Sequence, residues 1–423
     1  MSGTTRRVAL AYGSSTLEID VPADATVVMP AHRPPVSDEL ATLRSALERP
    51  VAGRPLRELV PPGARVAISI CDATRPQPRR PMLEALAQML DGLARPEDVV
   101  VLIATGTHSV STDAQRREML GDEILGHWRV EDHNARAPDS LRDLGVIDGV
   151  PVFLNREWVD ADVRITTGFV EPHFFAGFSG GPKMVAPGLA GLETVLELHS
   201  PARIADPRAT FAVIKGNPVH DPVRAIAAAT GVMFALDVLI DDRHRITHAF
   251  GGPVLEMHEV ACRTARDVAM QPVRGPFDIV VTTNSGYPLD RNLYQTVKGM
   301  AAAATVVADG GTILCAAECR DGLPEDGSYA RLLRSGPSIA AVAEGILAAG
   351  RAVPDGWQVQ VQARVQERAH VRLQSGLPDA DVRAAHLEPI EDVSRTLDEL
   401  LARQPDARVC VLPEGPQTIP YLT

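Results

Sequence analysis

The stretch Arg65-Val-Ala-Ile-Ser-Ile-Cys-Asp-Ala-Thr-Arg-Pro76 decides the fold, because it joins an apolar run to a polar loop and then to a helical pattern. Arg65–Ile70 has the short Val/Ile-rich composition of a buried strand. Pro81–Ala94 has helical spacing, with proline at a tolerable early position. A second apolar run follows at Asp98–Ala104. Strands that alternate with helices in this way predict an α/β protein with a mostly parallel sheet.

The same alternation continues along the chain. Thr112–Leu120 is expected to form a helix capped by Ser111 or Thr112. Further strands are predicted at Val163–Thr167, Phe234–Ile240, Asp278–Thr283, Gly311–Ala317, Trp357–Val365 and Arg408–Leu412.

The fold class predicted is therefore α/β with two domains, each with a mostly parallel sheet flanked by helices, and an active site in the interdomain cleft. The prolines and the glycine of Gln271–Pro276 favour a domain boundary there. We expect an N-terminal domain over residues 1–270 that carries the cofactor and acid/base residues, and a C-terminal domain over 275–390. Residues 391–423 are left open to return to the first domain.

Length, composition and charge exclude several classes of protein. The chain has 423 residues, 45% of them apolar, which suffices for two cores. Its net charge is −12 and its arginines are scattered among acids, so we expect no nucleic-acid partner. No targeting signature and no apolar run near the roughly 18 residues of a membrane span is present, so a cytoplasmic protein without membrane contact is expected.

The five cysteines are odd in number and sit mostly in apolar surroundings, which predicts reduced thiols in the core. They are Cys71, Cys262, Cys315, Cys319 and Cys410. The C-x-x-x-C spacing of Cys315 and Cys319 is a weak metal signal, and burial for packing is the favoured interpretation.

Polar residues cluster where two of the predicted strands end, which is where open α/β sheets bind ligands. Asp72, Thr74 and Arg75 follow the first strand, and the Arg75 guanidinium suits a carboxylate ligand. A turn closed by an Arg75–Asp72 ion pair explains the same residues equally well. In Thr105-Gly-Thr-His108, Gly106 allows close backbone approach and His108 is a candidate proton carrier, although a lone histidine in a turn is more often a surface residue.

The densest segment is Gly168-Phe-Val-Glu-Pro-His-Phe-Phe-Ala-Gly-Phe-Ser-Gly-Gly-Pro-Lys-Met-Val-Ala-Pro-Gly188. Five glycines and three prolines exclude a regular helix or strand, and four phenylalanines predict burial. A buried loop that carries His173 and Lys183, followed by His199, is difficult to explain by packing alone. The spacing Ser179–Lys183 departs from that of a phosphate-binding P-loop, although its amides could still cradle one phosphate.

A fourth polar segment follows the first strand of the expected C-terminal domain. Gln295 and Lys298, three residues apart, share a helix face, and Tyr294 lies beside them. A solvated helix start is the alternative, but a lysine near a helix N-terminus favours a bound anion. Together with Arg75, these groups would form a carboxylate clamp.

Over essentially its whole length the chain resembles the nickel-dependent lactate racemase family, whose members use a nickel pincer nucleotide. The resemblance rests on the conjunction of five motifs in order: D-x-T-R-P at Asp72–Pro76, T-G-T-H at Thr105–His108, E-P-H-x-F-x-G-F-S-G-G-P-K at Glu171–Lys183, H-S-P at His199, and Y-Q-x-x-K at Tyr294–Lys298. Each motif alone is weak, and the ordered set is specific.

The resemblance implies an isomerase that inverts C2 of a small 2-hydroxy acid, lactate or a close analogue. It implies that Lys183 is covalently joined to pyridinium-3-thioamide-5-thiocarboxylic acid mononucleotide and that His199 binds the nickel. His108 and His173 would be the acid/base pair. The resemblance further implies cofactor contacts at Asp72, Thr107, Ser179 and Gly180, and substrate contacts at Arg75, Tyr294, Gln295, Lys298 and Trp357. Proteins that make or insert the cofactor are the expected partners.

Sulfur and carbon donors plus one imidazole suit square-planar nickel, so the chain needs no ligand cluster of its own. Two other interpretations stay open. The same machinery could epimerise a longer hydroxy acid or a sugar-type substrate. In a different class, His108, His173 and His199 could bind zinc in a hydrolase with Glu171 as the base, although their separations do not favour this.

Overall fold

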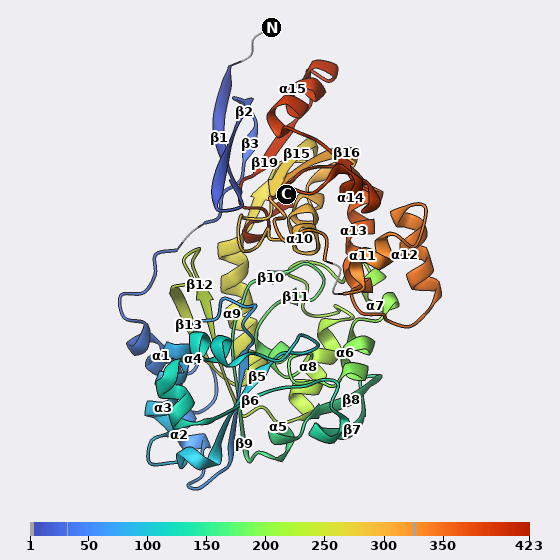
Figure 1. The fold of residues 1–423 in the computed structure, drawn as a ribbon. Helices are drawn as coiled ribbons and strands as arrows, with labels where there is room; N and C mark the ends of the chain where they lie inside the picture. Colours follow the sequence, from blue (N-terminus) through green and yellow to red (C-terminus); the bar gives the residue numbers. More distant parts are fainter. Residues whose placement is uncertain (1–3, 32, 325–326) are drawn as a thin grey trace. The chain divides into compact units, whose positions relative to one another are not determined.

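The structure, a computed structural model, describes residues 4–31, 33–324 and 327–423. The chain forms two compact units (Figure 1). The first unit comprises His32–His199 and Pro207–Arg266, and the second comprises Met1–Ala31, Ser200–Asp206 and Asp267–Thr423. This division differs from the expected one, because both ends of the chain belong to the second unit.

The first unit is built on a six-stranded sheet in which five neighbouring strands are parallel and one edge strand is antiparallel. Its order is β13 (Ile246–Gly252), β12 (Phe234–Ile240), β9 (Val163–Phe169), β4 (Val66–Cys71), β5 (Val99–Ala104) and β6 (Arg129–Asp132). The four strands predicted here are confirmed to within two residues at each end. Their near-continuous burial is typical of parallel strands covered on both faces.

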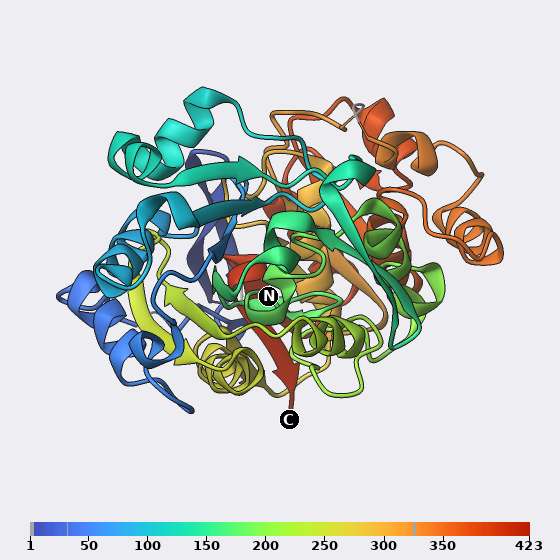
Figure 2. The same cartoon turned by 90° about the horizontal axis from the view of Figure 1, so that it is seen from below.

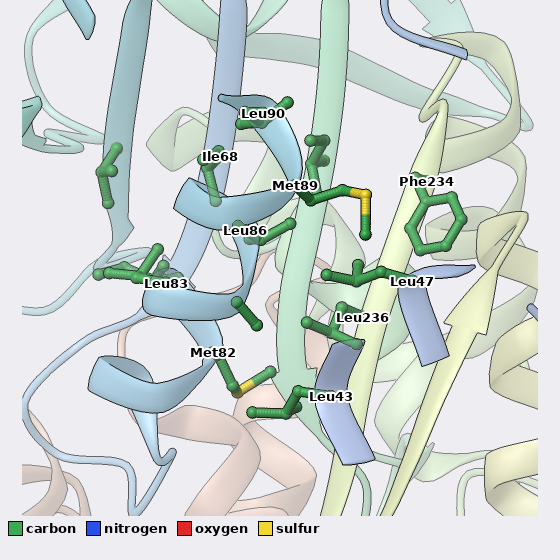
Figure 3. Close-up of a cluster of buried hydrophobic side chains, with 14 of the residues drawn as sticks. Leu43, Leu47, Ile68, Met82, Leu83, Leu86, Met89, Leu90, Phe234 and Leu236 are labelled. Atoms are coloured by element: carbon green, nitrogen blue, oxygen red, sulfur yellow. The ribbon is translucent and has the colours of Figure 1, made fainter. Parts of the chain in front are cut away.

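One face of this sheet packs against α1 (Glu39–Glu48) and α3 (Arg79–Leu90). Figure 3 shows Leu83 and Leu86 of α3 beside Ile68 of β4, with Leu43 of α1 near Leu236. These side chains are fully buried. Helix α3 ends at Leu90, four residues before the predicted end.

The other face of the same sheet is covered by the glycine-rich segment. Because side chains alternate along a strand, Ser69 points away from Ile68, and its hydroxyl donates to the Met184 carbonyl at 2.8 Å. Asp237 of β12 lies on this face too, because its carboxylate accepts a hydrogen bond from the Gly181 N–H in the glycine-rich segment. Figure 2 shows α1 and α3 on one side of the sheet and α9 (Val254–Ala269) on the other.

The remaining elements of the first unit are short or peripheral. Helix α4 (Asp113–His127) begins as predicted at the N-cap Thr112, whose side chain forms a capping box with Gln115. The others are α2 (Leu56–Leu59), η1 (Pro96–Asp98), η2 (Pro138–Ser140), β7 (Leu141–Ile147), β8 (Val150–Asn155), α5 (Arg156–Asp160), β10 (Pro172–His173), β11 (Gly177–Phe178), η3 (Gly181–Met184), α6 (Leu192–Leu198) and α8 (His220–Ala229).

The second unit has its own six-stranded sheet, parallel throughout. Its order is β18 (Glu388–Pro389), β17 (Ala369–Gln374), β16 (Val307–Ala316), β15 (Phe277–Thr283), β19 (Val409–Leu412) and β3 (Thr26–Val27). Both ends of the chain belong here because β3 pairs with β19, and β20 (Ile419–Leu422) pairs with β14 (Met270–Val273). Residues 391–423 therefore stay with this unit.

The other elements of the second unit surround this sheet. They are β1 (Thr5–Tyr12), β2 (Ser15–Pro22), α7 (Pro201–Ala205), α10 (Leu293–Ala304), α11 (Tyr329–Leu333), α12 (Ile339–Ala348), α13 (Gly356–Arg368), α14 (Asp379–Ala384), α15 (Val393–Arg403) and η4 (Gly415–Gln417). Strands β15, β16 and β19 confirm three predicted strands.

The predicted strand Trp357–Val365 is wrong, because these residues form helix α13. Gln358, Gln360 and Gln362, which alternate with valines in this segment, are all buried. Gln360 donates to the Pro201 carbonyl at 3.0 Å and Gln362 to the Ala385 carbonyl at 2.8 Å. Amide side chains satisfied by backbone carbonyls allow a helix to be buried on most of its surface.

Candidate active site

Three polar loops of the first unit leave the carboxyl ends of neighbouring strands. Asp72 follows β4, His108 follows β5, and the glycine-rich segment follows β9. Cys71 lies opposite Ala104 in the β4–β5 register, so the first two loops start side by side. The chain builds β5 and β6 on one side of β4, and β9 and β12 on the other. This edge is therefore a topological switch point, where open α/β sheets bind ligands.

Asp72 and His108 form a close pair at this edge. The Asp72 Oδ2 atom lies 2.6 Å from His108 Nδ1, and its Oδ1 accepts a hydrogen bond from the Thr74 hydroxyl at 2.7 Å. The Asp72 side chain is only 7% exposed, whereas that of His108 is 48% exposed. Burial raises the pKa of Asp72, but the His108 hydrogen bond and charge outweigh it and hold this pKa below its usual value. The carboxylate thus orients an imidazole whose other nitrogen is accessible.

A buried arginine holds the loop after β4 in place, and the sequence analysis missed it. The Arg79 guanidinium donates to the carbonyls of Cys71 at 2.8 Å, Gln77 at 3.2 Å and Arg75 at 2.7 Å, and also to that of Asp72. Burial lowers the pKa of Arg79. Its position at the start of α3 was the available signal, since an arginine there is poorly suited to the helix dipole.

Arg75 is exposed, and within the described ranges no ion pair joins it to Asp72. The turn closed by such a pair is therefore not what the structure contains, although the Arg75 charge still lowers the pKa of Asp72. Thr107 lies in the turn before His108, and its carbonyl accepts a hydrogen bond from Arg136 at 2.9 Å.

His173 lies in a tight hairpin formed by β10 and β11, where it pairs with Gly177. Its Nδ1 accepts hydrogen bonds from the backbone N–H of Ala176 at 3.2 Å and, more weakly, of Phe175 at 3.5 Å. The ring stacks on Phe174 at 4.8 Å and meets the edge of Phe175 at 4.5 Å between centroids. Both phenylalanines are buried, as predicted. The position of this imidazole is thus set by the hairpin.

Two side chains that the sequence analysis missed hold the backbone of the turn that carries Lys183 through hydrogen bonds. Asp237 accepts a hydrogen bond from the Gly181 N–H at 2.6 Å, and the His258 Nε2 lies 2.8 Å from the Ser179 carbonyl. A Cβ at Gly180 would approach Asp237 to 2.6 Å. The Ser179 hydroxyl donates to the Phe169 carbonyl at 2.9 Å. An aspartate within the apolar run of β12 was the one available signal.

Burial raises the pKa of Asp237 to about 7, although the N–H groups of Gly181 and Gly168 lower it. Two buried histidines, His220 and His258, stack at 5.5 Å. Burial is the main cause that lowers the pKa of His258 to about 4, and burial also holds the pKa of His220 well below its usual value. Both rings are therefore neutral at physiological pH.

His199 follows α6 and is held in one orientation. Its Nδ1 lies 2.8 Å from the Val195 carbonyl, and its ring meets the edge of Phe175 at 5.4 Å. Burial lowers the pKa of His199 to about 4, and the positive charge of Lys183 contributes to this shift. The imidazole is therefore neutral at physiological pH.

The other predicted substrate residues belong to the second unit. The N-cap Asn292 starts α10 through its hydrogen bond to the Gln295 N–H at 3.0 Å, so Gln295 and Lys298 lie in the first two turns. The Tyr294 hydroxyl accepts a hydrogen bond from Trp357 Nε1 at 3.1 Å. The structure thus brings Tyr294 and Trp357 together, from helices α10 and α13.

All five cysteines are free and buried, as predicted. Over the ranges that the structure describes, no three His, Cys, Asp or Glu side chains gather into a metal-binding group. Nor does the described chain contain a helix long and apolar enough to cross a membrane.

Comparisons with known proteins agree with this arrangement. Residues 12–212 match the lactate racemase N-terminal domain, and residues 273–419 match the lactate racemase C-terminal domain. The chain is 32% identical to a lactate racemase of Thermoanaerobacterium thermosaccharolyticum over 97% of its own length and 98% of the relative's. It is 32% identical to a lactate racemase of Lactiplantibacillus plantarum over 89% and 90% of the two chains.

Solved structures give the same result. The lactate racemase apoprotein from T. thermosaccharolyticum superposes with a TM-score of 0.90 at 30% identity, covering 98% of this chain and all of that one. A Thermotoga maritima protein shares the fold, with a TM-score of 0.65 at 17% identity.

The fold and the polar loops at the switch point define a two-domain α/β enzyme, an isomerase of the racemase class. The chain belongs to the lactate racemase family. Membership in this family implies dependence on nickel.

Proposed function

We propose that this protein racemises or epimerises C2 of a small 2-hydroxy acid, lactate or a close analogue. The observation that carries the proposal is the Asp72–His108 pair at the switch point, in a chain similar to lactate racemases from end to end. The paired carboxylate keeps a proton on His108 Nδ1, so the neutral ring offers the lone pair of Nε2 to a substrate hydroxyl.

The residues of the first unit fit a nickel pincer nucleotide. Because a carbonyl oxygen can only accept, Nδ1 of His199 carries the proton and Nε2 carries the lone pair. A neutral imidazole held through its other nitrogen by a carbonyl is the form that ligates metals. We propose that His199 binds nickel and that Lys183 forms the covalent link, with contacts from Asp72, Thr107, Ser179 and Gly180.

When bound, this cofactor would accept and return the hydride of substrate C2. Removal of the same hydrogen as a proton would place a second negative charge beside the carboxylate, which is unfavourable. In our proposal His108 and His173 form the acid/base pair that exchanges the hydroxyl proton while the substrate passes through a planar 2-keto acid.

We propose that Arg75, Tyr294, Gln295, Lys298 and Trp357 bind the substrate. A guanidinium and an ammonium suit the carboxylate group, and a fixed carboxylate orients C2 for hydride transfer. The hydrogen bond between Trp357 and Tyr294 keeps both aromatic side chains in place.

A chiral assay tests the proposal. Protein made in a host with the cofactor pathway, whose synthesis and insertion proteins are its expected partners, is incubated with single enantiomers of 2-hydroxy acids and sugars. We expect racemisation of lactate or a close analogue, bound nickel, and retention at C2 of deuterium placed there. Activity only on longer acids or sugars would favour the epimerase alternative. Hydrolysis that depends on zinc would refute the racemase.

A further inference from the structure

The loop that follows β4 carries two residues of the proposed site, Asp72 and Arg75. Residues 73–75 are exposed, so side-chain packing does not fix the path of this loop. The pair formed by Asp72 and His108 nevertheless needs a fixed backbone, because the Asp72 Oδ2 atom lies only 2.6 Å from His108 Nδ1. Hydrogen bonds to the loop backbone are therefore expected to hold the carboxylate in place.

One buried side chain, that of Arg79, donates hydrogen bonds to four backbone carbonyls of this loop. Its Nε donates to the Cys71 carbonyl at 2.8 Å and its Nη1 to that of Gln77 at 3.2 Å. Its Nη2 donates to the Arg75 carbonyl at 2.7 Å and also to that of Asp72. These carbonyls lie at the start, in the middle and at the end of the loop. A single planar guanidinium therefore ties the whole loop together.

The guanidinium also brings a positive charge to the base of the loop. Arg79 is only 7% exposed, and it starts α3, where the helix dipole disfavours a cation. A buried charge is costly unless other groups compensate for it. The four carbonyls do so, and the negative charge of Asp72 opposes the effect of burial on the pKa of Arg79. The cost of burying a cation at this position indicates a role beyond packing.

We infer that Arg79 is a positioning residue of the active site: its guanidinium fixes the loop after β4 and thereby keeps the Asp72 carboxylate against His108. Arg79 thus acts through Asp72 and not on the substrate itself. Because Asp72 orients the imidazole, a displaced loop would misplace a group that exchanges the hydroxyl proton. The inference rests on the proposed function, which gives His108 this role.

Two variants of Arg79 and one matched control test the inference. Arg79→Met removes the donors and the charge but keeps most of the apolar stem, whereas Arg79→Lys keeps the charge without the planar fork. Arg164→Met is the control, because Arg164 lies near the start of β9, at the other end of the sheet from Asp72. The Arg164 guanidinium likewise donates to three backbone carbonyls, those of Val159, Ala161 and Gly231.

The first readout is the titration of Asp72 in the protein without cofactor. Burial raises the pKa of Asp72, but the groups that face its carboxylate, His108, Arg75 and Thr74, hold this pKa below its usual value. Burial raises the pKa of the neighbouring Cys71 thiol to about 12, so this thiol stays neutral over the same range. Carbon-13 NMR of protein with labelled aspartate carboxyl groups follows the titration, and Asp72→Asn assigns the signal.

We expect Arg79→Met to raise the pKa of Asp72, because a displaced loop weakens the contact with His108 and a nearby positive charge is lost. Arg79→Lys should raise this pKa less, and Arg164→Met should leave it unchanged. If circular dichroism shows that Arg79→Met does not fold, Arg79→Lys alone decides. A titration of Asp72 that stays as in wild type in the folded Arg79 variants would overturn the inference.

The second readout is the kcat of the loaded enzyme. Arg79→Met should lower kcat by about 10²-fold, the loss that a misplacement of about 1 Å can cause, and Arg164→Met should leave kcat unchanged. Because Arg79 acts through Asp72, the double variant Asp72→Asn/Arg79→Met should lose little more kcat than Asp72→Asn alone. Losses that add in the double variant would show that Arg79 acts independently of Asp72 and would refute the positioning role.

A wild-type loaded enzyme that racemises no 2-hydroxy acid would instead refute the proposed function. The titration of Asp72 in the protein without cofactor does not depend on activity, so the two failures are distinguishable.

Discussion

Replacement of Gly181 by alanine tests how tightly the Lys183 turn is fitted to the helix beneath it. The φ angle of Gly181 is +49°, which L-residues disfavour, and an added Cβ would lie 2.5 Å from two ring atoms of His258 and 2.8 Å from its Cβ. These atoms belong to the base of a buried side chain on α9, which has no flexible end to move aside.

The expected cost has two parts. The left-handed backbone costs about 1–2 kcal/mol for a residue with a Cβ. Overpacking against His258 adds about 1–3 kcal/mol, because the ring must shift and weaken its 2.8 Å hydrogen bond to the Ser179 carbonyl. Gly181→Ala should therefore lower the free energy of unfolding by about 2–5 kcal/mol. Gly63→Ala isolates the first part, since Gly63 has φ +76° and nothing within 4 Å of its added Cβ.

Urea unfolding followed by tryptophan fluorescence measures both variants. In a Trp357→Phe background, the remaining tryptophans, Trp128 and Trp158, are buried in the first unit and report on its unfolding alone. If Gly181→Ala costs no more than Gly63→Ala, the close fit between the turn and His258 is refuted.

Three further outcomes are expected. Asp72→Asn should lower kcat of the loaded enzyme by about 10²–10⁴-fold with an unchanged circular dichroism spectrum, because it removes the carboxylate that orients His108; near-normal kcat would contradict this role. The folded-state pKa of Asp237, about 7, lies above its unfolded value, so wild-type stability present at low pH is lost as pH rises. In urea titrations, the free energy of unfolding of Asp237→Asn relative to that of wild type should rise by about 1.4 kcal/mol per pH unit between about pH 4 and 7. A difference between the two proteins that does not change with pH would refute the raised pKa. Gln362→Leu should lower the free energy of unfolding by about 2–4 kcal/mol, because it leaves the buried Tyr329 hydroxyl without its acceptor. Adding Tyr329→Phe should recover part of this loss in the double variant, and additive losses of the two single variants would exclude the coupling.

The parallel strands that were predicted are short apolar runs, whereas β6 and β17 were missed because polar and exposed residues interrupt them. Val99–Ala104 and Phe234–Ile240 are such runs, and the structure confirms them. Helix α13 could not be recognised, because alternation along the chain gives no information on whether a glutamine meets water or a backbone carbonyl. Gln362 meets the carbonyl of Ala385, 23 residues further along.

In the candidate site too, residues in local motifs could be predicted and residues that act through long-range contacts could not. His108, His173 and His199 stand in local motifs, so the sequence identified them as candidates. Asp237 and His258 were missed because they act on the Lys183 turn from 56 and 79 residues away. Only the packing of β12 and α9 under the turn reveals these contacts.

A histidine can accept or donate at either nitrogen, and its backbone neighbours decide which. The Val195 carbonyl leaves the lone pair of His199 on Nε2, whereas the Ala176 N–H leaves a proton on Nε2 of His173. Each neighbour lies within four residues in sequence, but its direction depends on the helix end in one case and the hairpin in the other. The backbone around each ring therefore determines which nitrogen carries the proton, and this difference agrees with the proposed roles of His199 as a metal ligand and of His173 beside the substrate.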